Sequence, residues 1–129
     1  MDESKNICNA RLRRDEAAYI FRKYARLGLD RMDISPFEAY GRMRGASKNE
    51  TDALRLLGVY DMMRLLSLTD PESASAVRAV YFAERGKRPA KNQISERVLR
   101  FATDNHLDER TVYRRLKSAK DLYYHLIFQ

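Results

Sequence analysis

The stretch LDERTVYRRLKSAKDLYYHL, residues 107–126, limits the possible folds more than any other part of the chain. Apolar residues recur in it at intervals of four, three, four and three, which places them on one side of a helix. Asp108, just before this pattern, is a favourable N-cap residue. We therefore predict a long helix from Glu109 to Ile127 with one continuous buried seam. The seam residues are Val112, Leu116, Ala119, Tyr123 and Leu126.

A different face of the same predicted helix is cationic. Arg110, Tyr113, Arg114 and Lys117 are related by steps of three and four residues, so they are neighbours on the helix surface. The predicted helix therefore has an apolar side that packs into the core and a cationic side that can bind another molecule.

The rest of the chain also shows helix signals, and no convincing strand alternation interrupts them. We predict an all-α, multi-helix domain with a C-terminal helix-turn-helix. The first two expected helices cover residues 15–27, with a stop at Gly28, and residues 36–45, with Ser35 as the cap. A broadly apolar and most buried helix follows the cap signal SKNETD at 47–52. Two further helices run from Asp70-Pro71-Glu72 to Gly86 and from Ile94 to about Asn105.

These elements suggest two regions. Residues 1–46 form an N-terminal helical segment without an assigned role, which could dimerise the protein, contact polymerase or bind another protein. Residues 47–129 form a helical core that contains the helix-turn-helix module, at about residues 94–127.

The C-terminal end, LYYHLIF, is apolar and must pack on something. A helix from Glu109 to Ile127 would be roughly 28 Å long, which is more than groove reading alone requires. One interpretation packs this end on the protein's own N-terminal helices, and the sharper one makes it the seam of a homodimer. The sequence leaves both open.

Composition excludes several classes of protein. An apolar fraction of 44% in 129 residues is enough for a hydrophobic core, and there is no apolar run near the length of a membrane span. The N-terminus lacks the apolar segment of a secretory signal, so we expect a cytoplasmic protein. Cys8 has no cysteine partner, and His106 and His125 lack zinc spacing, so no metal or cofactor is implied.

The net charge of +7 is concentrated near the last two predicted helices. Residues 84–120 carry eleven basic and five acidic side chains, whereas residues 35–83 carry six of each. A concentrated basic surface is typical of phosphate binding, although a merely solvated face has the same composition.

Two helices joined by three or four residues, the second buried on one side and cationic near its start, have the layout of a helix-turn-helix. Such a second helix enters the major groove of double-stranded DNA, where arginine can donate two hydrogen bonds to guanine. The base-contact candidates are Arg110, Tyr113 and Arg114. The phosphate-contact candidates are Lys87, Arg88, Lys91, Arg97, Arg100, Arg115 and Lys117.

The segment AVRAVYF, a basic loop and ISERVLRFATDNHLDERTVYRRLKSAKDLYYHL together resemble phage late-transcription activators of the ArpU/RinA type, which have a sigma-factor region-four-like helix-turn-helix. The resemblance covers roughly residues 50–127. Its most specific part is ERTVYRRL at 109–116, with Ala102 at the small-residue position of the first motif helix. It implies that residues 111–113 begin the body of a recognition helix and that the protein binds promoter-region DNA to assist or regulate RNA polymerase.

His106 departs from this pattern, because such turns usually carry glycine at its position. A non-glycine residue at positive φ is uncommon, although histidine is among the better tolerated residues.

Two other classes of function compete with DNA binding. A protein-interaction module, an adaptor or inhibitor, could use the basic face on an acidic partner, and it would then expose an apolar patch there. An enzyme is the weakest reading, because the sequence has neither a glycine-rich phosphate loop nor a plausible catalytic triad.

Overall fold

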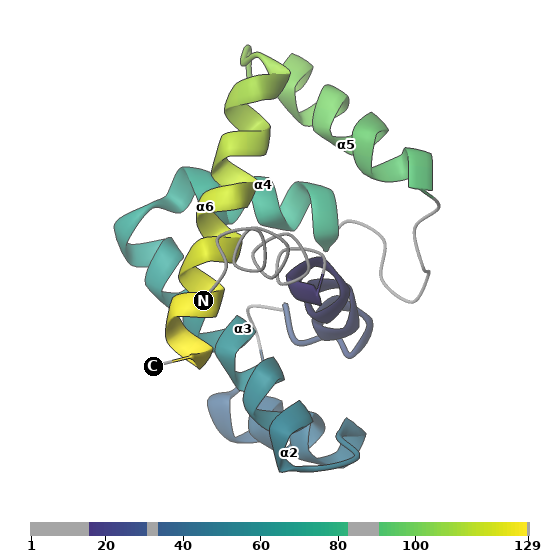
Figure 1. Cartoon of the computed structure of the whole chain (residues 1–129), viewed down its shortest axis with the longest axis vertical. Coiled ribbons are helices and arrows are strands. Elements are labelled where there is room, and N and C mark those ends of the chain that lie inside the picture. Colours follow the sequence, from purple (N-terminus) through teal and green to yellow (C-terminus); the bar gives the residue numbers. More distant parts are fainter. Residues whose placement is uncertain (1–15, 31–33, 83–90, 129) are drawn as a thin grey trace, which may run out of the picture.

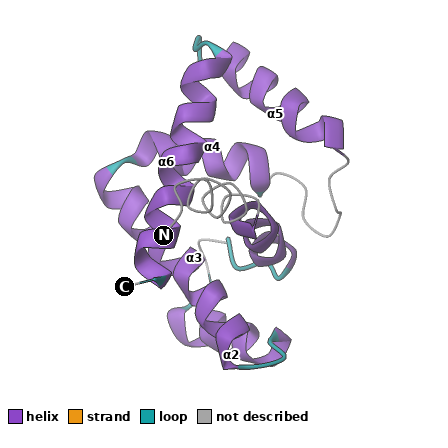
Figure 2. Ribbon diagram, in the orientation of Figure 1, coloured by secondary structure: helices purple, strands orange, loops and turns teal. Residues whose placement is uncertain are grey.

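The structure is a computed structural model that describes residues 16–30, 34–82 and 91–128. All regular elements within these residues are helices (Figure 2), which confirms the predicted all-α class. A helical segment at residues 16–26 is followed by α2 (Pro36–Ala46), α3 (Glu50–Thr69), α4 (Pro71–Tyr81), α5 (Lys91–Asp104) and α6 (Glu109–Ile127). None of the helices in this described part combines the length and hydropathy that a bilayer span requires.

Side-chain caps start these helices where the sequence predicts them. The Ser35 hydroxyl accepts a hydrogen bond from the Glu38 amide at 3.1 Å, and the Asp70 carboxylate accepts one from the Ser73 amide at 3.3 Å. The cap signal at residues 47–52 is also confirmed as a helix start, with Asn49 as the residue whose side chain caps α3. Each cap satisfies an amide that has no partner within its helix.

Gly28 stops the first helical segment, as predicted. Its φ is 70°, and the amides of Gly28 and Leu29 donate to the carbonyls of Ala25 and Tyr24. This is the Schellman arrangement, in which glycine takes the left-handed position at no steric cost.

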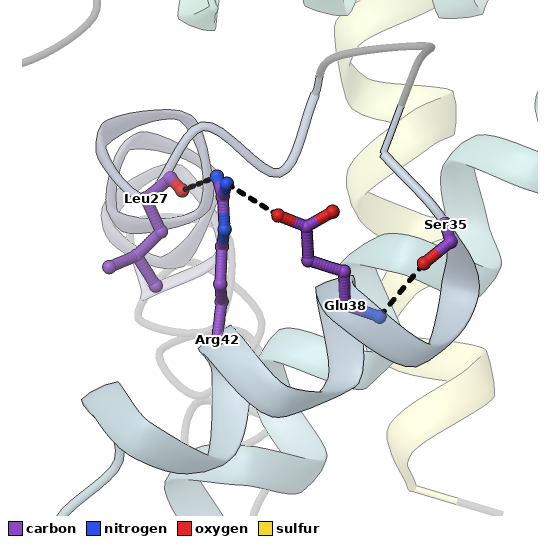
Figure 3. Close-up of polar contacts among 4 residues, drawn as sticks. All are labelled: Leu27, Ser35, Glu38 and Arg42. Atoms are coloured by element: carbon purple, nitrogen blue, oxygen red, sulfur yellow. Dashed lines mark hydrogen bonds and ion pairs between the residues drawn. The ribbon is translucent and has the colours of Figure 1, made fainter.

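Arg42 of α2 ties that helix to the end of the first segment (Figure 3). Its guanidinium donates to the Leu27 carbonyl at 3.3 Å and pairs with Glu38 at 2.9 Å. A cation beside the C-terminal carbonyls of a helix is favourable for the helix dipole. The contact therefore helps to orient α2.

Two helix bounds differ from the prediction. The helix expected to reach Gly86 ends at Tyr81, because Phe82 leaves helical geometry with ψ near 0°, and residues 83–90 lie outside the described part. Conversely, α5 begins at Lys91, inside the stretch predicted as a loop from its basic composition. None of residues 91–93 is a helix breaker, so composition was a poor guide there.

One hydrophobic core joins the N-terminal helical segment to the rest of the molecule. The Phe21 ring lies edge-on against Tyr81 and Tyr123, with centroids 5.6 and 5.5 Å apart. The Ala17 amide donates to the Tyr124 hydroxyl at 2.9 Å. The C-terminal end of α6 therefore packs on the protein's own N-terminal helix, which was the first of the two interpretations. The core crosses the predicted boundary at residue 46.

The helix α3 is less enclosed than predicted. On its broad apolar face Leu56, Val59, Met62 and Leu66 are buried, but Leu57 and Tyr60 are only partly buried. On the opposite side, Leu54, Leu65 and Leu68 are exposed. The expectation of the most buried helix is therefore wrong for one face, because the described neighbours pack against the others.

Candidate nucleic-acid interface

Helix α5 and the first turns of α6 lie together at one end of the molecule, and α2 lies at the other (Figure 1). Four residues connect the two helices, from Asn105 to Asp108. This is the connection length expected for a helix-turn-helix.

His106 determines how the chain leaves α5. It has a φ of 55°, and its amide donates to the Thr103 carbonyl at 3.3 Å. The next amide, of Leu107, donates to the Ala102 carbonyl at 2.8 Å. These two bonds form the same Schellman arrangement as at Gly28, with histidine in the left-handed position. The turn predicted to be unusual thus has a regular geometry.

Asp108 begins α6 as predicted. Its carboxylate accepts a hydrogen bond from the Thr111 amide at 2.8 Å. This bond, helped by the charges of Arg110 and Arg114, holds the pKa of the Asp108 carboxyl below its usual value. The anion also opposes the positive end of the helix dipole.

The predicted seam of α6 packs into the core along most of its length. Val112, Leu116, Ala119 and Tyr123 are buried, and Leu126 is partly buried. Ala102 and Val98 of α5 are buried in the same core, and Leu107 packs against it. Because the seam is held in this way, the opposite side of the first turns of α6 faces solvent.

The side chains at that solvent-facing side are the predicted base-contact candidates. Arg110, Tyr113 and Arg114 are all exposed, and Lys117 follows one turn later, also exposed. Glu109 is exposed in the first turn. Three cations and one aromatic ring thus share the accessible face of the N-terminal half of α6.

Arg97 corrects one of the predicted phosphate contacts. Its side chain is only 9% exposed and donates to the Val80 carbonyl of α4 at 2.9 Å. An arginine held in this way joins α5 to α4 and cannot reach a phosphate. The sequence contained the signal, because Arg97 lies three residues after Ile94 and next to Val98, on the buried face of α5. Arg100, by contrast, is exposed.

Arg115 is also partly engaged within the protein. Its guanidinium pairs with Glu72 of α4 at 3.2 Å, and its side chain is mostly covered whereas that of Glu72 is mostly exposed. Lys120, for which the sequence pattern predicted no role, lies over the Tyr81 ring at 5.3 Å from its centroid. Both cations therefore help to fasten α6 to α4.

Three phosphate-contact candidates cannot be placed. Lys87 and Arg88 lie outside the described residues. Lys91 is the first residue of α5, but its side chain is not among those described. Of the predicted phosphate contacts in the described part, Arg100 and Lys117 keep accessible charges.

Comparison with known proteins finds no protein-family model, no characterised protein and no solved structure that matches this chain.

Proposed function

We propose that this protein is a sequence-specific regulator of transcription, of phage or mobile-element type, that binds double-stranded DNA with the helix beginning at Glu109. The observation that carries the proposal is the shared exposure of Arg110, Arg114 and Lys117 on the first turns of α6. The resemblance of residues 109–116 to a recognition helix points in the same direction.

Local geometry supports this assignment. The turn at His106 and the cap at Asp108 hold α5 and α6 as a pair, while the buried seam leaves the cationic side of α6 accessible. An α-helix fits the major groove of B-DNA, and the N-terminal residues of a recognition helix contact the base edges. The first three turns of α6 have the required chemistry.

The accessible side chains divide by chemistry into two roles. Arg110 and Arg114 have planar guanidinium groups that can bind the O6 and N7 atoms of guanine together. Tyr113, between them in sequence, is the third candidate for base contact. Lys117 and Arg100 are suited to phosphate, which positions the protein on the duplex without selecting a sequence.

The rival function, an adaptor that binds an acidic protein, has less support. An adaptor would expose an apolar patch beside its cations, because apolar burial provides much of the affinity in protein interfaces. The exposed leucines of α3 belong to a different helix from the cationic turns. Among the described residues of α5 and of the first turns of α6, Leu99 is the one large aliphatic side chain that is exposed.

The salt dependence of DNA binding tests where the phosphates bind. We expect Lys117→Ala to weaken binding to a random-sequence duplex and to lower the slope of log affinity against log salt by about 1, because one counterion fewer is released. The measurement is fluorescence anisotropy of a labelled duplex at several salt concentrations.

Lys48→Ala is the matched control. Lys48 is exposed between α2 and α3 and its loss changes the net charge equally. The affinity and slope of this variant should equal those of the unchanged protein. Equal effects of the two substitutions would mean that DNA is attracted by total charge alone, and would contradict the proposed location.

A further inference from the structure

Helix α3 exposes apolar side chains along one face. Leu54, Leu65 and Leu68 are 56%, 39% and 84% exposed, and none of the described elements covers them. Exposed apolar side chains that gather on one face commonly mark an interaction surface. The exposed face is therefore a surface that another molecule can cover.

A groove continues this face. It lies between α3 and the end of α6, has a volume of about 450 Å³, and is lined in part by Leu54, Leu57 and Ile127. Ile127 approaches α3 so closely that a Cβ on Gly58 would collide with it. The groove is open to solvent, and Arg55 and Asp61 line it beside the apolar residues. Leu68, farther along the same helix, is exposed.

We propose that this face of α3, together with the groove, binds a second copy of the chain across a two-fold axis. In this arrangement the two α3 helices run antiparallel. Leu68 enters the groove beside Leu57 of the second copy, and Asp61 faces Arg64 of the second copy. In an antiparallel pair, a step forward along one helix corresponds to an equal step backward along the other. Leu68 lies four residues after Arg64, and Leu57 lies four residues before Asp61, so both contacts form in the same register.

The charges of the molecule favour a second copy as the occupant. The chain carries a net charge of +7, so two copies repel each other overall. Residues 35–83, which include α3, carry six basic and six acidic side chains. Asp61 and Arg64 are both exposed, and a two-fold axis converts this one pair of opposite charges into two ion pairs.

Apolar burial and charge contribute differently to this interface. Exposed ion pairs add little affinity, so burial of the leucines must provide most of it. The ion pairs determine the register, because a shift along the helix would lose both. DNA or an acidic protein would not choose this neutral face over the cationic one.

The proposed interface stands independently of DNA binding. If both proposals hold, a dimer would present two copies of α6, and its preferred DNA would contain two inverted half-sites. The first test below uses no DNA, so its failure and the failure of the DNA proposal are separate results.

The test is sedimentation velocity over a range of protein concentrations. The unchanged protein should form a species with twice its mass of 15.1 kDa. Leu68→Glu should weaken dimerisation at least about ten-fold. Phe37→Glu is the matched control, because Phe37 is 90% exposed on α2 and receives the same charge. This control should dimerise normally. A monomer at every concentration, or a dimer that Leu68→Glu leaves intact, would overturn the proposal.

A charge exchange tests the register and the identity of the partner. Asp61→Arg and Arg64→Asp should each weaken self-association, and a mixture of the two variants should form heterodimers because every facing pair is then opposite in charge. The double variant Asp61→Arg/Arg64→Asp should again form homodimers. Failure of the two single variants to combine would overturn the proposed register, provided that both retain the circular dichroism spectrum of the unchanged protein.

Discussion

At the scale of single residues, His106 and Gly28 perform the same backbone task. Each occupies the left-handed position after a helix, with φ of 55° and 70°, and each is followed by a residue whose amide binds back into the helix. Glycine adopts this conformation freely, whereas any other L-residue pays a steric cost. The residues around the turn therefore hold His106 in the left-handed conformation, and the resulting strain lowers the free energy of unfolding.

We expect His106→Gly to raise the free energy of unfolding by about 1 kcal/mol, because relief of the left-handed strain exceeds the additional flexibility of the unfolded chain. Urea unfolding followed by circular dichroism measures the change. Thr103→Gly, in the last turn of α5, is the control and should lower stability, since glycine disfavours a helix there. An unfolding free energy for His106→Gly at or below that of the unchanged protein would contradict this account of the turn.

Arg97 and Arg100 show how far the candidate site could be predicted. Both are arginines of α5 in a basic region, so a count of charges gives them the same role. The structure buries one against the Val80 carbonyl and exposes the other. Helical spacing from Ile94 separates them, but the pairing of Arg115 with Glu72, 43 residues away, could not be found in this way. Local periodicity indicates on which side of its helix a side chain lies, but it does not identify the residue that this side chain contacts.

At the scale of elements, α6 combines a fixed start with a buried seam. The start depends on Asp108, whose carboxylate binds the Thr111 amide. Because the folded state lowers the pKa of this carboxyl, the associated stability is present above the pKa of the unfolded chain and is lost as the pH falls through the folded value.

We expect low pH to reduce the thermal stability of the unchanged protein more than that of the variant Asp108→Asn. Asparagine caps a helix about as well as aspartate but does not titrate. The difference in melting temperature between the two proteins should therefore be steady near neutral pH and should shift in favour of Asp108→Asn below roughly pH 4. Thermal melts from pH 7 to pH 3 provide the measurement. Parallel curves across this range would show that the charge of Asp108 does not help to start α6.

Helix α3 marks the limit of periodicity as a guide to burial. The broad apolar face of α3 predicts the most buried helix of the molecule. The buried side was predicted correctly at Leu56 and Val59, but Leu68 at the far end is 84% exposed. A sequence cannot tell whether an apolar face meets the same chain or another molecule.

At the scale of the whole molecule, helix starts and buried seams were predicted well and long-range contacts were not. The caps at Ser35, Asp70 and Asp108 are local interactions, so a few neighbouring residues determine them. The contact between Ala17 and Tyr124 joins residues 107 positions apart, and no local pattern indicates it. Long-range packing decided between the two interpretations of the C-terminal end.

Charge separates two regions of the molecule. The neutral region contains α2, α3 and α4, and the cationic one contains α5 and the first turns of α6. Helix α2 and the cationic region lie at opposite ends of the molecule, and α4 lies between them (Figure 1). We infer that one helix, α6, connects the proposed surface for DNA with the proposed surface for self-association.

Sequence-specific DNA binding through α6 can be tested by selection from a random pool of duplex DNA at two salt concentrations, followed by sequencing of the retained molecules. The unchanged protein should enrich a defined motif, and the double variant Arg110→Ala/Arg114→Ala should lose it. The double variant Arg26→Ala/Arg44→Ala removes the same charge from exposed sites elsewhere and should keep the motif. Retention without any motif and with steep salt dependence, or no retention at low salt, would contradict the account.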